Sequence, residues 1–404
     1  MKILWHSNAP YVPTGYGQQT DIVTRQLRAA GHDVAISCFW GLGGAMLERE
    51  GIRLYPADEE WGNTTLVGIA HHFGEGDASR VQVITLMDVW VLTAKILSTL
   101  NLASWVPVDH DPLPPRVREF FARTGSHPIA MSRFGERMLR DAGLDPSYVP
   151  HGIPTDVFRP VPQDVARQLV GAIPADAFCV GMVAANKGQA LPRKCFPQVF
   201  RAFAELARRH DDAFLYLHSM RQEPKNGLDL VQLADVMGVP LSRIVFTPPL
   251  ALALGMEQEK MAAVYSQFDV LANSSLGEGF GIPIVEAQAC GVPVIVTDCT
   301  AMSELVGAGW SVGGELLYDP SQGAHYTLPR HDDLVDALEQ AYQSRTGKPD
   351  PAAIEFAAGY DAAKVFEAYW RPVLATLEER VAARAAIPGL RPNRATRRRA
   401  KAKT

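Results

Sequence analysis

The sequence predicts an α/β protein with two doubly wound, Rossmann-like domains that face each other across a cleft. In the first part of the 404-residue chain, short apolar runs alternate with amphipathic stretches, which is the pattern of βαβ units. After the turn-rich segment VPHGIPTDVFRPVP the same alternation begins again. Because ligands of doubly wound sheets bind at the carboxyl ends of the strands, we expect functional residues in the loops that follow strands.

The first domain is expected to span residues 1–155. A helix is predicted from about Gln18 to Ala30, and another at FGERMLRDAG. Apolar runs typical of buried strands predict the sheet, with strands at KILWHS, DVAISCF, LVGIAHHF, VQVITLMD, SWVPVD and PIAMS. Residues 156–176 are expected to form a linker.

The second domain is expected to span residues 177–350. Its first helix is predicted from about Phe196 to His210, and its strands at FCVGMVAAN, AFLYLHS, IVFTPP, VLANSS and VIVTD. Residues 351–385 predict a helical segment that could cross back to the first domain. Residues 386–404 are expected to form a basic, disordered tail.

Composition predicts a protein that stays in the cytoplasm. Apolar residues make up 47% of the chain, but no stretch approaches the roughly 20 apolar residues that span a bilayer. The apolar start is interrupted by His6 and Asn8 and is too short for a signal peptide. The five cysteines show no CxxC spacing, which indicates reduced, mostly buried thiols and no zinc site.

Charge is distributed unevenly along the chain. The last residues, RPNRATRRRAKAKT, carry seven basic side chains and no acid, so the first 390 residues carry −12, seven charges below the whole chain's −5. Such a tail either contacts a polyanion or is a terminus without a defined partner, and both interpretations stay open.

The strongest functional signal lies between Asn273 and Asp298, in NSSLGEGFGIPIVEAQACGVPVIVTD. Pro283 fits the first position of a helix, while Gly291 and the proline after it end that helix. Glu286 is therefore expected in the first helical turns, and the strand VIVT follows.

The loop before this helix predicts an anion and sugar site. Gly279 and Gly281 let the backbone approach a ligand closely, so the N–H groups of the helix start can bind phosphate oxygens. Glu278 in the same loop is suited to bind sugar hydroxyls. Ser275, at the end of the preceding strand, could hydrogen-bond phosphate or simply end the strand. An ordinary strand, turn and helix with two solvated acids is the alternative.

The pattern Glu278-Gly-Phe-Gly, then Glu286-Ala, then Gly-Val-Pro-Val-Ile closely resembles the E-x7-E segment of retaining, nucleotide-sugar-dependent glycosyltransferases of the GT-B fold, in the family-4 type of glycosyl transferases group 1. The resemblance covers about residues 1–380. It implies that Glu278 and the residues after it lie against the donor sugar, that backbone N–H groups of Gly279, Phe280 and Gly281 hold the diphosphate, and that Glu286 binds the ribose.

The start of the second domain, VAANKGQALPRKCFPQVFRAF, resembles the family segment in which an Arg and a Lys neutralise the donor diphosphate. Lys194 falls where the family has its Lys, whereas Asn186 and Lys187 occupy the expected place of the Arg. We therefore expect Arg193 and Lys194 to stabilise the leaving diphosphate, with Asn186 at the donor and Lys187 as a weaker candidate. A solvated pair at a helix start is the alternative.

Asp109, His110 and Asp111 follow the predicted strand SWVPV and are expected at the carboxyl edge of the first domain. The family often carries a His there that contacts the donor sugar, and the resemblance transfers this role to His110. Asp109 could orient the imidazole or meet the acceptor. Metal binding is a rival interpretation, although neighbouring residues seldom converge on one ion. Asp88, at another strand end, could line the acceptor side or cap a helix.

Gly15 and Gly17, between the first strand and first helix, resemble the glycine loop that shapes the acceptor side in this family. TGYGQQT lacks the third glycine of GxGxxG, and no acidic residue follows the second strand at ISCFW, which argues against an NAD enzyme.

We therefore predict a glycosyltransferase that moves a sugar from a nucleotide-diphosphate sugar to a hydroxyl acceptor, with retention implied by the resemblance and with neither metal nor other cofactor. The acceptor stays open among a saccharide, a lipid carrier, a protein and a modified nucleic acid. The alternatives are a sugar-nucleotide epimerase or phosphorylase on the same fold, or a non-catalytic sugar-nucleotide-binding protein.

Overall fold

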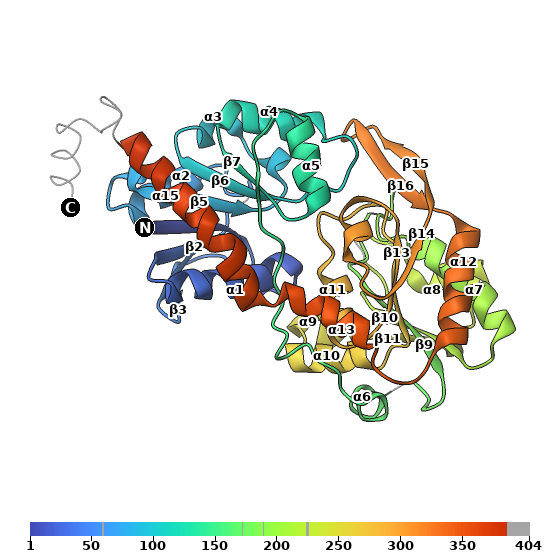
Figure 1. Cartoon of the computed structure of the whole chain (residues 1–404). Coiled ribbons are helices and arrows are strands. Elements are labelled where there is room, and N and C mark those ends of the chain that lie inside the picture. Colours follow the sequence, from blue (N-terminus) through green and yellow to red (C-terminus); the bar gives the residue numbers. More distant parts are fainter. Residues whose placement is uncertain (59, 172, 189, 224–225, 386–404) are drawn as a thin grey trace. The chain divides into compact units, whose positions relative to one another are not determined.

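The computed structural model describes residues 1–385 apart from 59, 172, 189 and 224–225, and the predicted basic tail lies outside the described residues (Figure 1). The described chain forms two compact units. Unit 1 comprises residues 1–107, 113–152 and the described residues from Val365 on, and unit 2 comprises residues 108–112 and 153–364. The α/β class predicted from the sequence is confirmed.

Unit 1 is built on an eight-stranded sheet in the order β3-β4-β2-β1-β5-β6-β7-β8, in which the paired strands are parallel except for β3 with β4. The strands are β1 (Lys2–Asn8), β2 (Asp33–Trp40), β3 (Leu47–Arg49), β4 (Ile52–Tyr55), β5 (Val81–Leu86), β6 (Asn101–Val106), β7 (His127–Ala130) and β8 (Ser147–Tyr148). The α-helices of this unit are α1 (Gly15–Ala29), α2 (Leu66–Phe73), α3 (Ala94–Leu97), α4 (Pro115–Thr124), α5 (Arg133–Asp141) and α15 (Arg371–Ala385).

Two details of unit 1 differ from the sequence prediction. LVGIAHHF is helix α2 instead of a strand: Leu66, Ala70 and Phe73 are its buried residues, and their spacing of four and three marks one face of a helix. Helix α1 begins at Gly15, earlier than predicted, because the Thr14 hydroxyl accepts the Gly17 N–H and caps the helix. The two glycines therefore lie in the first helical turn and not in the loop.

Three tryptophans form the centre of the packing in unit 1. Trp5, Trp105 and Trp370 are at most 1% exposed, and their rings meet edge-to-face with centroids 5.0 to 6.1 Å apart. Trp370 ends a π-helical turn (Phe366–Trp370) that leads into α15, so the end of the described chain is fastened to the first strands of unit 1.

Unit 2 contains a six-stranded parallel sheet in the order β11-β10-β9-β12-β13-β14 and a separate hairpin, β15-β16. The strands are β9 (Phe178–Val183), β10 (Ala213–His218), β11 (Ile244–Phe246), β12 (Val270–Asn273), β13 (Val294–Thr297), β14 (Gly309–Val312), β15 (Gly314–Asp319) and β16 (Ala324–Pro329). Its α-helices are α6 (Gln163–Val170), α7 (Phe196–Arg209), α8 (Leu230–Met237), α9 (Pro249–Leu254), α10 (Gln258–Ser266), α11 (Ile282–Ala289), α12 (His331–Ser344) and α13 (Pro351–Ala357), and α14 (Ala362–Val365) leads to the π-helical turn of unit 1.

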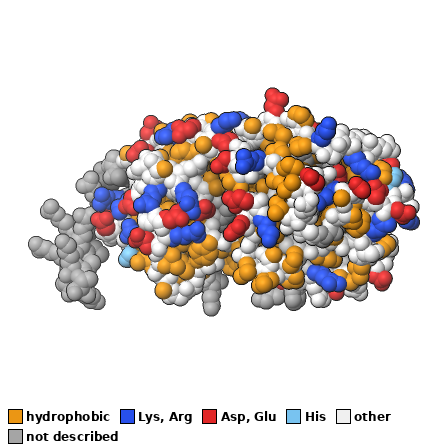
Figure 2. All heavy atoms as spheres, turned by 90° about the horizontal axis from the view of Figure 1, so that it is seen from below, with side chains coloured by type: hydrophobic (Ala, Val, Ile, Leu, Met, Phe, Trp, Pro, Cys, Tyr) orange, Lys and Arg blue, Asp and Glu red, His pale blue; other side chains and the backbone are white. Residues whose placement is uncertain are grey.

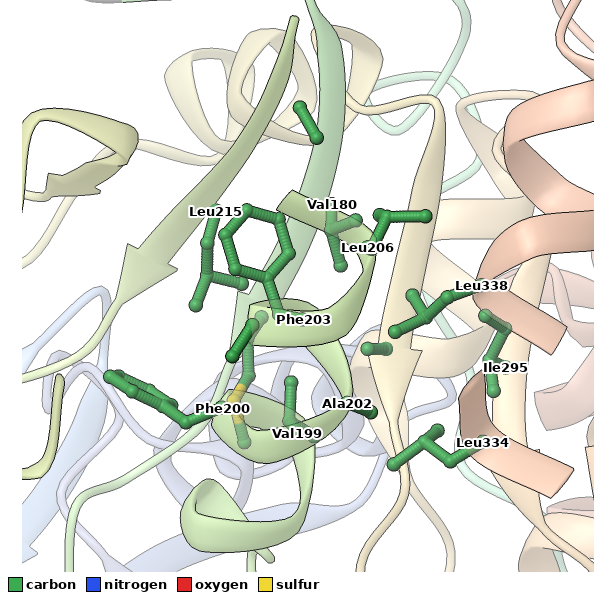
Figure 3. Packing of buried hydrophobic residues seen from close by; sticks show 14 of the residues in the cluster. Val180, Val199, Phe200, Ala202, Phe203, Leu206, Leu215, Ile295, Leu334 and Leu338 are labelled. Carbon is green, nitrogen blue, oxygen red and sulfur yellow. The ribbon is translucent and has the colours of Figure 1, made fainter. Parts of the chain in front are cut away.

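The core of unit 2 lies between its sheet and helices α7 and α12. Figure 3 shows Phe203 of α7 beside Leu215 of the sheet, and Phe200 of the same helix, Val180 of the sheet and Leu338 of α12 belong to the same buried cluster. All five side chains are fully buried, so the loops at the strand ends rest on a packed framework.

The expected linker contains a helix that packs into unit 2. Arg167 of α6 is 6% exposed and pairs with Asp269 at 3.1 Å, and it donates further bonds to backbone carbonyls. The helical segment predicted at 351–385 divides between the units: α13 packs on α11 in unit 2, and the chain from Val365 belongs to unit 1.

Charged side chains are mixed on the surface. On the face shown in Figure 2, Lys and Arg side chains lie interspersed with Asp and Glu, with hydrophobic side chains between them. Among the described residues, no helix combines the length and apolarity that a bilayer crossing requires.

Replacing Trp370 by Ala should destabilise unit 1 by about 3–5 kcal/mol, because it leaves a cavity between Trp5 and Trp105. Met46→Ala, at a side chain that is 50% exposed, is the matched control and should cost well under about 1 kcal/mol. Urea unfolding followed by tryptophan fluorescence measures both. Equal losses in the two variants would contradict the central role of this cluster.

Candidate active site in the second unit

Glu278 lies in the tight loop between β12 and α11, as the sequence predicts. Gly281 caps the helix with φ +112°, a conformation that glycine adopts at little cost. Helix α11 begins at Ile282, so Pro283 occupies the second helical position and not the first. The loop and the helix start together present backbone groups beside the Glu278 carboxylate.

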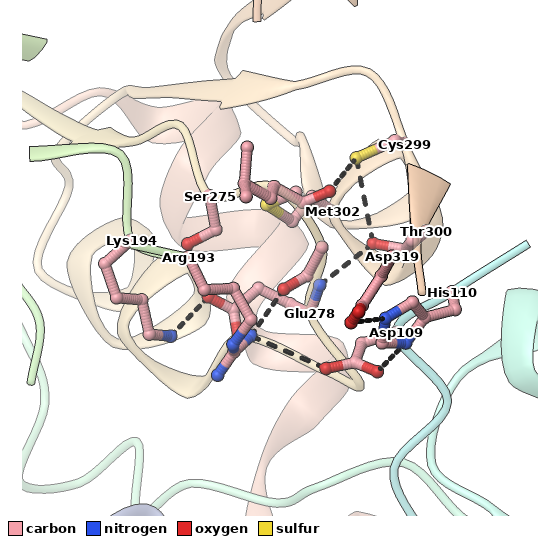
Figure 4. A network of polar contacts seen from close by, with 12 residues as sticks. Asp109, His110, Arg193, Lys194, Ser275, Glu278, Cys299, Thr300, Met302 and Asp319 are labelled. Carbon is pink, nitrogen blue, oxygen red and sulfur yellow. Dashed lines mark hydrogen bonds and ion pairs between the residues drawn. The ribbon is translucent and has the colours of Figure 1, made fainter. Parts of the chain in front are cut away.

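Both oxygens of the Glu278 carboxylate have partners (Figure 4). Its Oε1 accepts a hydrogen bond from the Lys194 ammonium and one from the Ser275 hydroxyl, the latter at 2.6 Å. Its Oε2 lies 3.0 Å from Nη1 of Arg193. Its backbone N–H donates to the Thr300 hydroxyl at 3.0 Å. The structure therefore brings four predicted site residues, Glu278, Ser275, Arg193 and Lys194, into one network.

The segment before α7 is laid along this loop by backbone contacts. The Arg193 carbonyl accepts the Leu276 N–H at 2.8 Å, and the Arg193 guanidinium donates to the Gly277 carbonyl. Cys195 then caps α7 in the left-handed region with φ +52° and packs with Leu276 and Tyr326 in a small buried cluster. This sharp turn aims the two preceding cations at Glu278.

Electrostatics fix the charge states in the network. Burial alone would raise the pKa of Glu278, but the Lys194 and Arg193 charges outweigh it and lower the pKa to about 2. Burial lowers the pKa of Arg193, yet the carboxylates of Glu278 and Asp109 raise it overall, so the guanidinium stays charged. Burial and the neighbouring Arg193 charge both lower the pKa of Lys194. The Glu278 carboxylate raises it, but the pKa stays below its ordinary value.

The two cations are more exposed to solvent than the carboxylate that they contact. The Glu278 side chain is 8% exposed, whereas the Arg193 and Lys194 side chains are 33% and 20% exposed. A buried carboxylate thus holds two partly accessible cations in a fixed geometry, an arrangement that can bind an anionic ligand.

His110 joins the same network through Asp109. Its Nδ1 lies 2.7 Å from Asp109 Oδ1, and its Nε2 lies 3.4 Å from Asp319 Oδ2. Its ring packs on the Tyr326 ring at a tilt of 34°, with centroids 3.8 Å apart. The other Asp109 oxygen lies 3.7 Å from Arg193 Nη1. Figure 4 shows the imidazole between the carboxylates of Asp109 and Asp319, and the Tyr326 ring packs against it as well.

The His110 loop was expected at the edge of the first domain, but residues 108–112 belong to unit 2. Asp111 and His325 exchange backbone hydrogen bonds of 3.1 and 2.8 Å, which fasten the loop to strand β16. A side chain at Gly277 would overlap the Asp109 carbonyl, so this glycine permits the close approach. The strand before this loop was predicted from the sequence, whereas the β15-β16 hairpin that binds the loop was not.

Asp319, Tyr326 and Thr300 are site residues that the sequence reasoning missed. Asp319 and Tyr326 belong to the β15-β16 hairpin, and Asp319 also accepts the Ser321 N–H at 2.8 Å. The segment DPSQG, with an Asp, a Pro and a Gly between two alternating apolar runs, was an available hairpin signal. Nothing in the sequence indicated that it would meet His110.

Two predicted donor-binding residues have other partners. Glu286 lies on α11, is 6% exposed and accepts a hydrogen bond from the Tyr265 hydroxyl at 2.7 Å. The Asn186 carboxamide donates to the carbonyls of Met220 and Leu228 and accepts the Leu228 N–H, so it organises a neighbouring loop. Their donor contacts stay predictions.

Three predicted acceptor-side residues lie in unit 1. Gly15 and Gly17 are in the first turn of α1, and a side chain at Gly17 would overlap the Val12 carbonyl, so this glycine is required by packing. Asp88 follows β5 directly before a short 3-10 turn, Val89–Val91, without capping it through its side chain. Across the described ranges, no group of three His, Cys, Asp or Glu residues is arranged to hold a metal ion.

Comparison with known proteins finds a family model that matches part of unit 2. Residues 176–343 match the family model described as glycosyl transferases group 1. Over these residues the chain is similar to that family. The match covers β9 to α12, including the loop of Glu278 and the segment of Arg193 and Lys194.

Curated relatives carry a glycosyltransferase name. D-inositol 3-phosphate glycosyltransferase of Mycobacterium leprae is 31% identical over 217 residues, which are 53% of this chain and 44% of that protein. Its namesake in Rhodococcus opacus is 30% identical over 181 residues, 43% of this chain and 38% of that protein. The chain therefore covers less than half of either relative's length.

Solved glycosyltransferases of the GT-B fold share the architecture. Sucrose-phosphate synthase from Thermosynechococcus elongatus superposes with a TM-score of 0.69 at 16% identity, over 93% of this chain and all of that one. The Anabaena protein HepE in complex with UDP-glucose gives a TM-score of 0.64 at 18% identity, over 93% of this chain and 100% of that one. The predicted GT-B fold is confirmed.

Replacing Glu278 by Gln should remove a pH-dependent contribution to folding. The folded-state pKa of Glu278 is about 2 against an ordinary 4.5, so its stabilisation is present above pH 4.5 and is lost as the pH falls towards 2. We expect the variant to be less stable than wild type by on the order of 3 kcal/mol at pH 6, with the gap closing below pH 3. Urea unfolding between pH 2.5 and 6 measures this. Glu259→Gln, at an exposed position of α10, is the control, and a parallel curve for Glu278→Gln would contradict the prediction.

Proposed function

We propose that this protein is a glycosyltransferase that transfers a sugar from a nucleotide-diphosphate sugar to a hydroxyl group. The observation that carries the proposal is the pair of partly exposed cations, Arg193 and Lys194, held by the buried Glu278 beside the glycine-rich start of α11. The family match and the relatives' names support the same reaction class.

The chemistry needs stabilisation of a leaving diphosphate. As the bond between the anomeric carbon and the diphosphate oxygen breaks, negative charge grows on the phosphate oxygens. The acceptor oxygen bonds to the anomeric carbon, and the proton of its hydroxyl passes to the departing diphosphate or to water. Arg193 and Lys194 supply positive charge that is already oriented, so little reorganisation is needed during the reaction. The N–H groups of the loop Gly279–Gly281 and the positive end of α11 add dipoles of the same sign.

The contacts of Glu278 indicate which of two roles is the main one, orienting the cations or contacting the donor sugar. Since both carboxylate oxygens are engaged by Lys194, Ser275 and Arg193, Glu278 acts in this proposal mainly by orienting the two cations, and its sugar contact is secondary. Glu286 is assigned to the ribose, and His110 to the donor sugar. Retention at the anomeric carbon, a cytoplasmic location and independence of metal ions are further parts of the proposal.

The direct test is a mass-spectrometric screen of nucleotide sugars for release of nucleoside diphosphate by the full-length protein. At least one donor should be turned over by hydrolysis or transfer. Release of a nucleoside diphosphate with no other acceptor than water would separate this reaction from epimerisation, which leaves the diphosphate attached. A protein that binds donors but turns over none would be the non-catalytic alternative.

Arg193→Ala and Lys194→Ala should each lower turnover of the donor by on the order of 100-fold, because each removes one preorganised charge from the leaving group. Lys187→Ala is the control, since this exposed side chain is a weaker candidate on the same segment. Steady-state kinetics with the donor found in the screen measure all three. Loss of activity in Lys187→Ala alone would show that the segment was assigned wrongly.

Transfer should survive treatment with EDTA, because fixed cations and backbone N–H groups take the part that a divalent ion plays in metal-dependent enzymes. Activity is measured after dialysis against chelator, with and without added Mn²⁺ or Mg²⁺. If activity is abolished and a metal ion restores it, Asp109, His110 and Asp111 become the first candidates for its ligands.

A further inference from the structure

The sheet of unit 1 has a topological switch point between β1 and β5. From β1 the chain builds the sheet outward through β2 and β4, and from β5 it continues in the opposite direction through β6 and β7. In doubly wound sheets, ligands bind outside the carboxyl ends of the strands at such a point. The loops after β1, β2, β4 and β5 therefore border the expected binding edge of unit 1.

Each of these four loops carries an exposed aromatic side chain. Tyr11 follows β1, Trp40 ends β2, Trp61 follows β4 and Trp90 follows β5, and they are 44%, 51%, 50% and 41% exposed. We call these four residues the aromatic rim. Single exposed apolar residues are common on protein surfaces, so a binding surface is indicated here by the placement of all four rings at the ends of parallel strands along one edge of the sheet.

The rim is held on ordered loops. The Tyr11 hydroxyl donates to the Gly41 carbonyl at 3.0 Å, next to Trp40. The Trp61 carbonyl lies 3.0 Å from Nε2 of the buried His6, and the Trp61 ring packs on Phe39 with centroids 5.6 Å apart. These contacts reduce the entropy that a ligand would have to overcome on binding.

Trp61 and Trp90 belong to loops that are tied to each other. The Asn63 amide donates to the Val91 carbonyl at 3.0 Å, and its carbonyl oxygen accepts the Thr93 N–H at 2.6 Å. Asp58 accepts hydrogen bonds from Gly62 and Thr65 and shapes the Trp61 loop from within. The hydrogen bonds of Asn63 therefore hold together the two loops that carry the tryptophans.

We propose that the aromatic rim binds a neutral saccharide, which is the acceptor of the transfer reaction. Flat aromatic rings offer rigid apolar surfaces to the C–H faces of sugar rings. The assignment of this saccharide as the acceptor rests on the proposed function, whereas the binding of the saccharide to the rim does not.

The charge of the loops at this edge favours a neutral saccharide over an anionic ligand. Among the residues that the structure describes, the segments 9–14, 41–46, 56–65 and 87–93 contain no Lys or Arg and three acidic residues, namely Asp58, Glu60 and Asp88. Arg49 is near the rim, 5.8 Å from the Tyr11 ring, and it lies 3.9 Å from Glu50. Such an edge disfavours phosphorylated acceptors, nucleic acids and anionic lipids, which bind to positive surfaces. The acceptor should thus differ in charge from the inositol 3-phosphate in the relatives' name.

The test uses the full-length protein and its variants Trp40→Ala, Trp61→Ala and Trp90→Ala. Leu254→Ala, at a side chain that is 76% exposed on α9, is the control for loss of a surface apolar group. Binding is measured on immobilised maltoheptaose, cellohexaose, mannohexaose and a β-1,3-glucan heptamer, with inositol phosphate, single-stranded DNA and phosphatidylcholine vesicles as rival probes. Release of nucleoside diphosphate from the donor in water is measured in parallel.

We expect retention of at least one neutral oligosaccharide, weakened at least about tenfold in two or more of the tryptophan variants and unchanged in Leu254→Ala. Donor hydrolysis should keep its wild-type rate in all four variants. No retention of any neutral oligosaccharide, equal retention by wild type and tryptophan variants, or tryptophan-dependent binding of a rival probe instead would each overturn the proposal. If the saccharide binds but no donor is turned over, the proposed function fails while the rim assignment stands.

Discussion

A carboxylate buried in a protein must be neutralised, and the candidate site is organised around this constraint at Glu278. Its side chain is 8% exposed, and the desolvation that would otherwise protonate it is outweighed by Arg193 and Lys194. The carboxylate in turn stabilises the two cations, because the neighbouring positive charges would repel each other without the anion between them. The carboxylate therefore determines where positive charge meets solvent, and the tight turn at Cys195 and the bond from Leu276 to Arg193 serve that placement.

The same constraint extends to His110. Asp109 lies between the imidazole and Arg193, so the orientation of the ring is coupled to the cation pair through one carboxylate. The hairpin β15-β16 closes the arrangement with Asp319 and Tyr326, and backbone bonds between Asp111 and His325 hold the two segments in register. His110 and Asp319, which are 209 positions apart in the sequence, thus belong to one electrostatic network. No single sequence motif therefore contains the whole site.

Sequence alone predicted the parts of the fold that depend on local pattern. The parallel strands of both units and the helix after the Glu278 loop follow from apolar runs and from glycine and proline placement. LVGIAHHF was misjudged because a short apolar run suits a buried strand or helix equally, and the choice depended on packing at Leu66, Ala70 and Phe73. The meeting of Glu278 with Arg193 and Lys194 was foreseen only as a shared role in donor binding. Their direct ion pairs, and the contact of His110 with Asp319, depend on tertiary contacts that no spacing encodes.

The two units carry different kinds of side chains at the carboxyl ends of their strands, and the difference indicates what kind of ligand each unit binds. Unit 2 gathers paired charges with the anion recessed and the cations accessible, which suits a ligand carrying phosphate. Unit 1 places aromatic rings among acidic residues at its switch point, which suits a ligand carrying hydroxyls and no negative charge. A transfer reaction between a diphosphate-activated sugar and a neutral sugar needs one site of each kind. Two anionic substrates would instead require positive charge in both units, and the segments 9–14, 41–46, 56–65 and 87–93 of unit 1 contain no Lys or Arg.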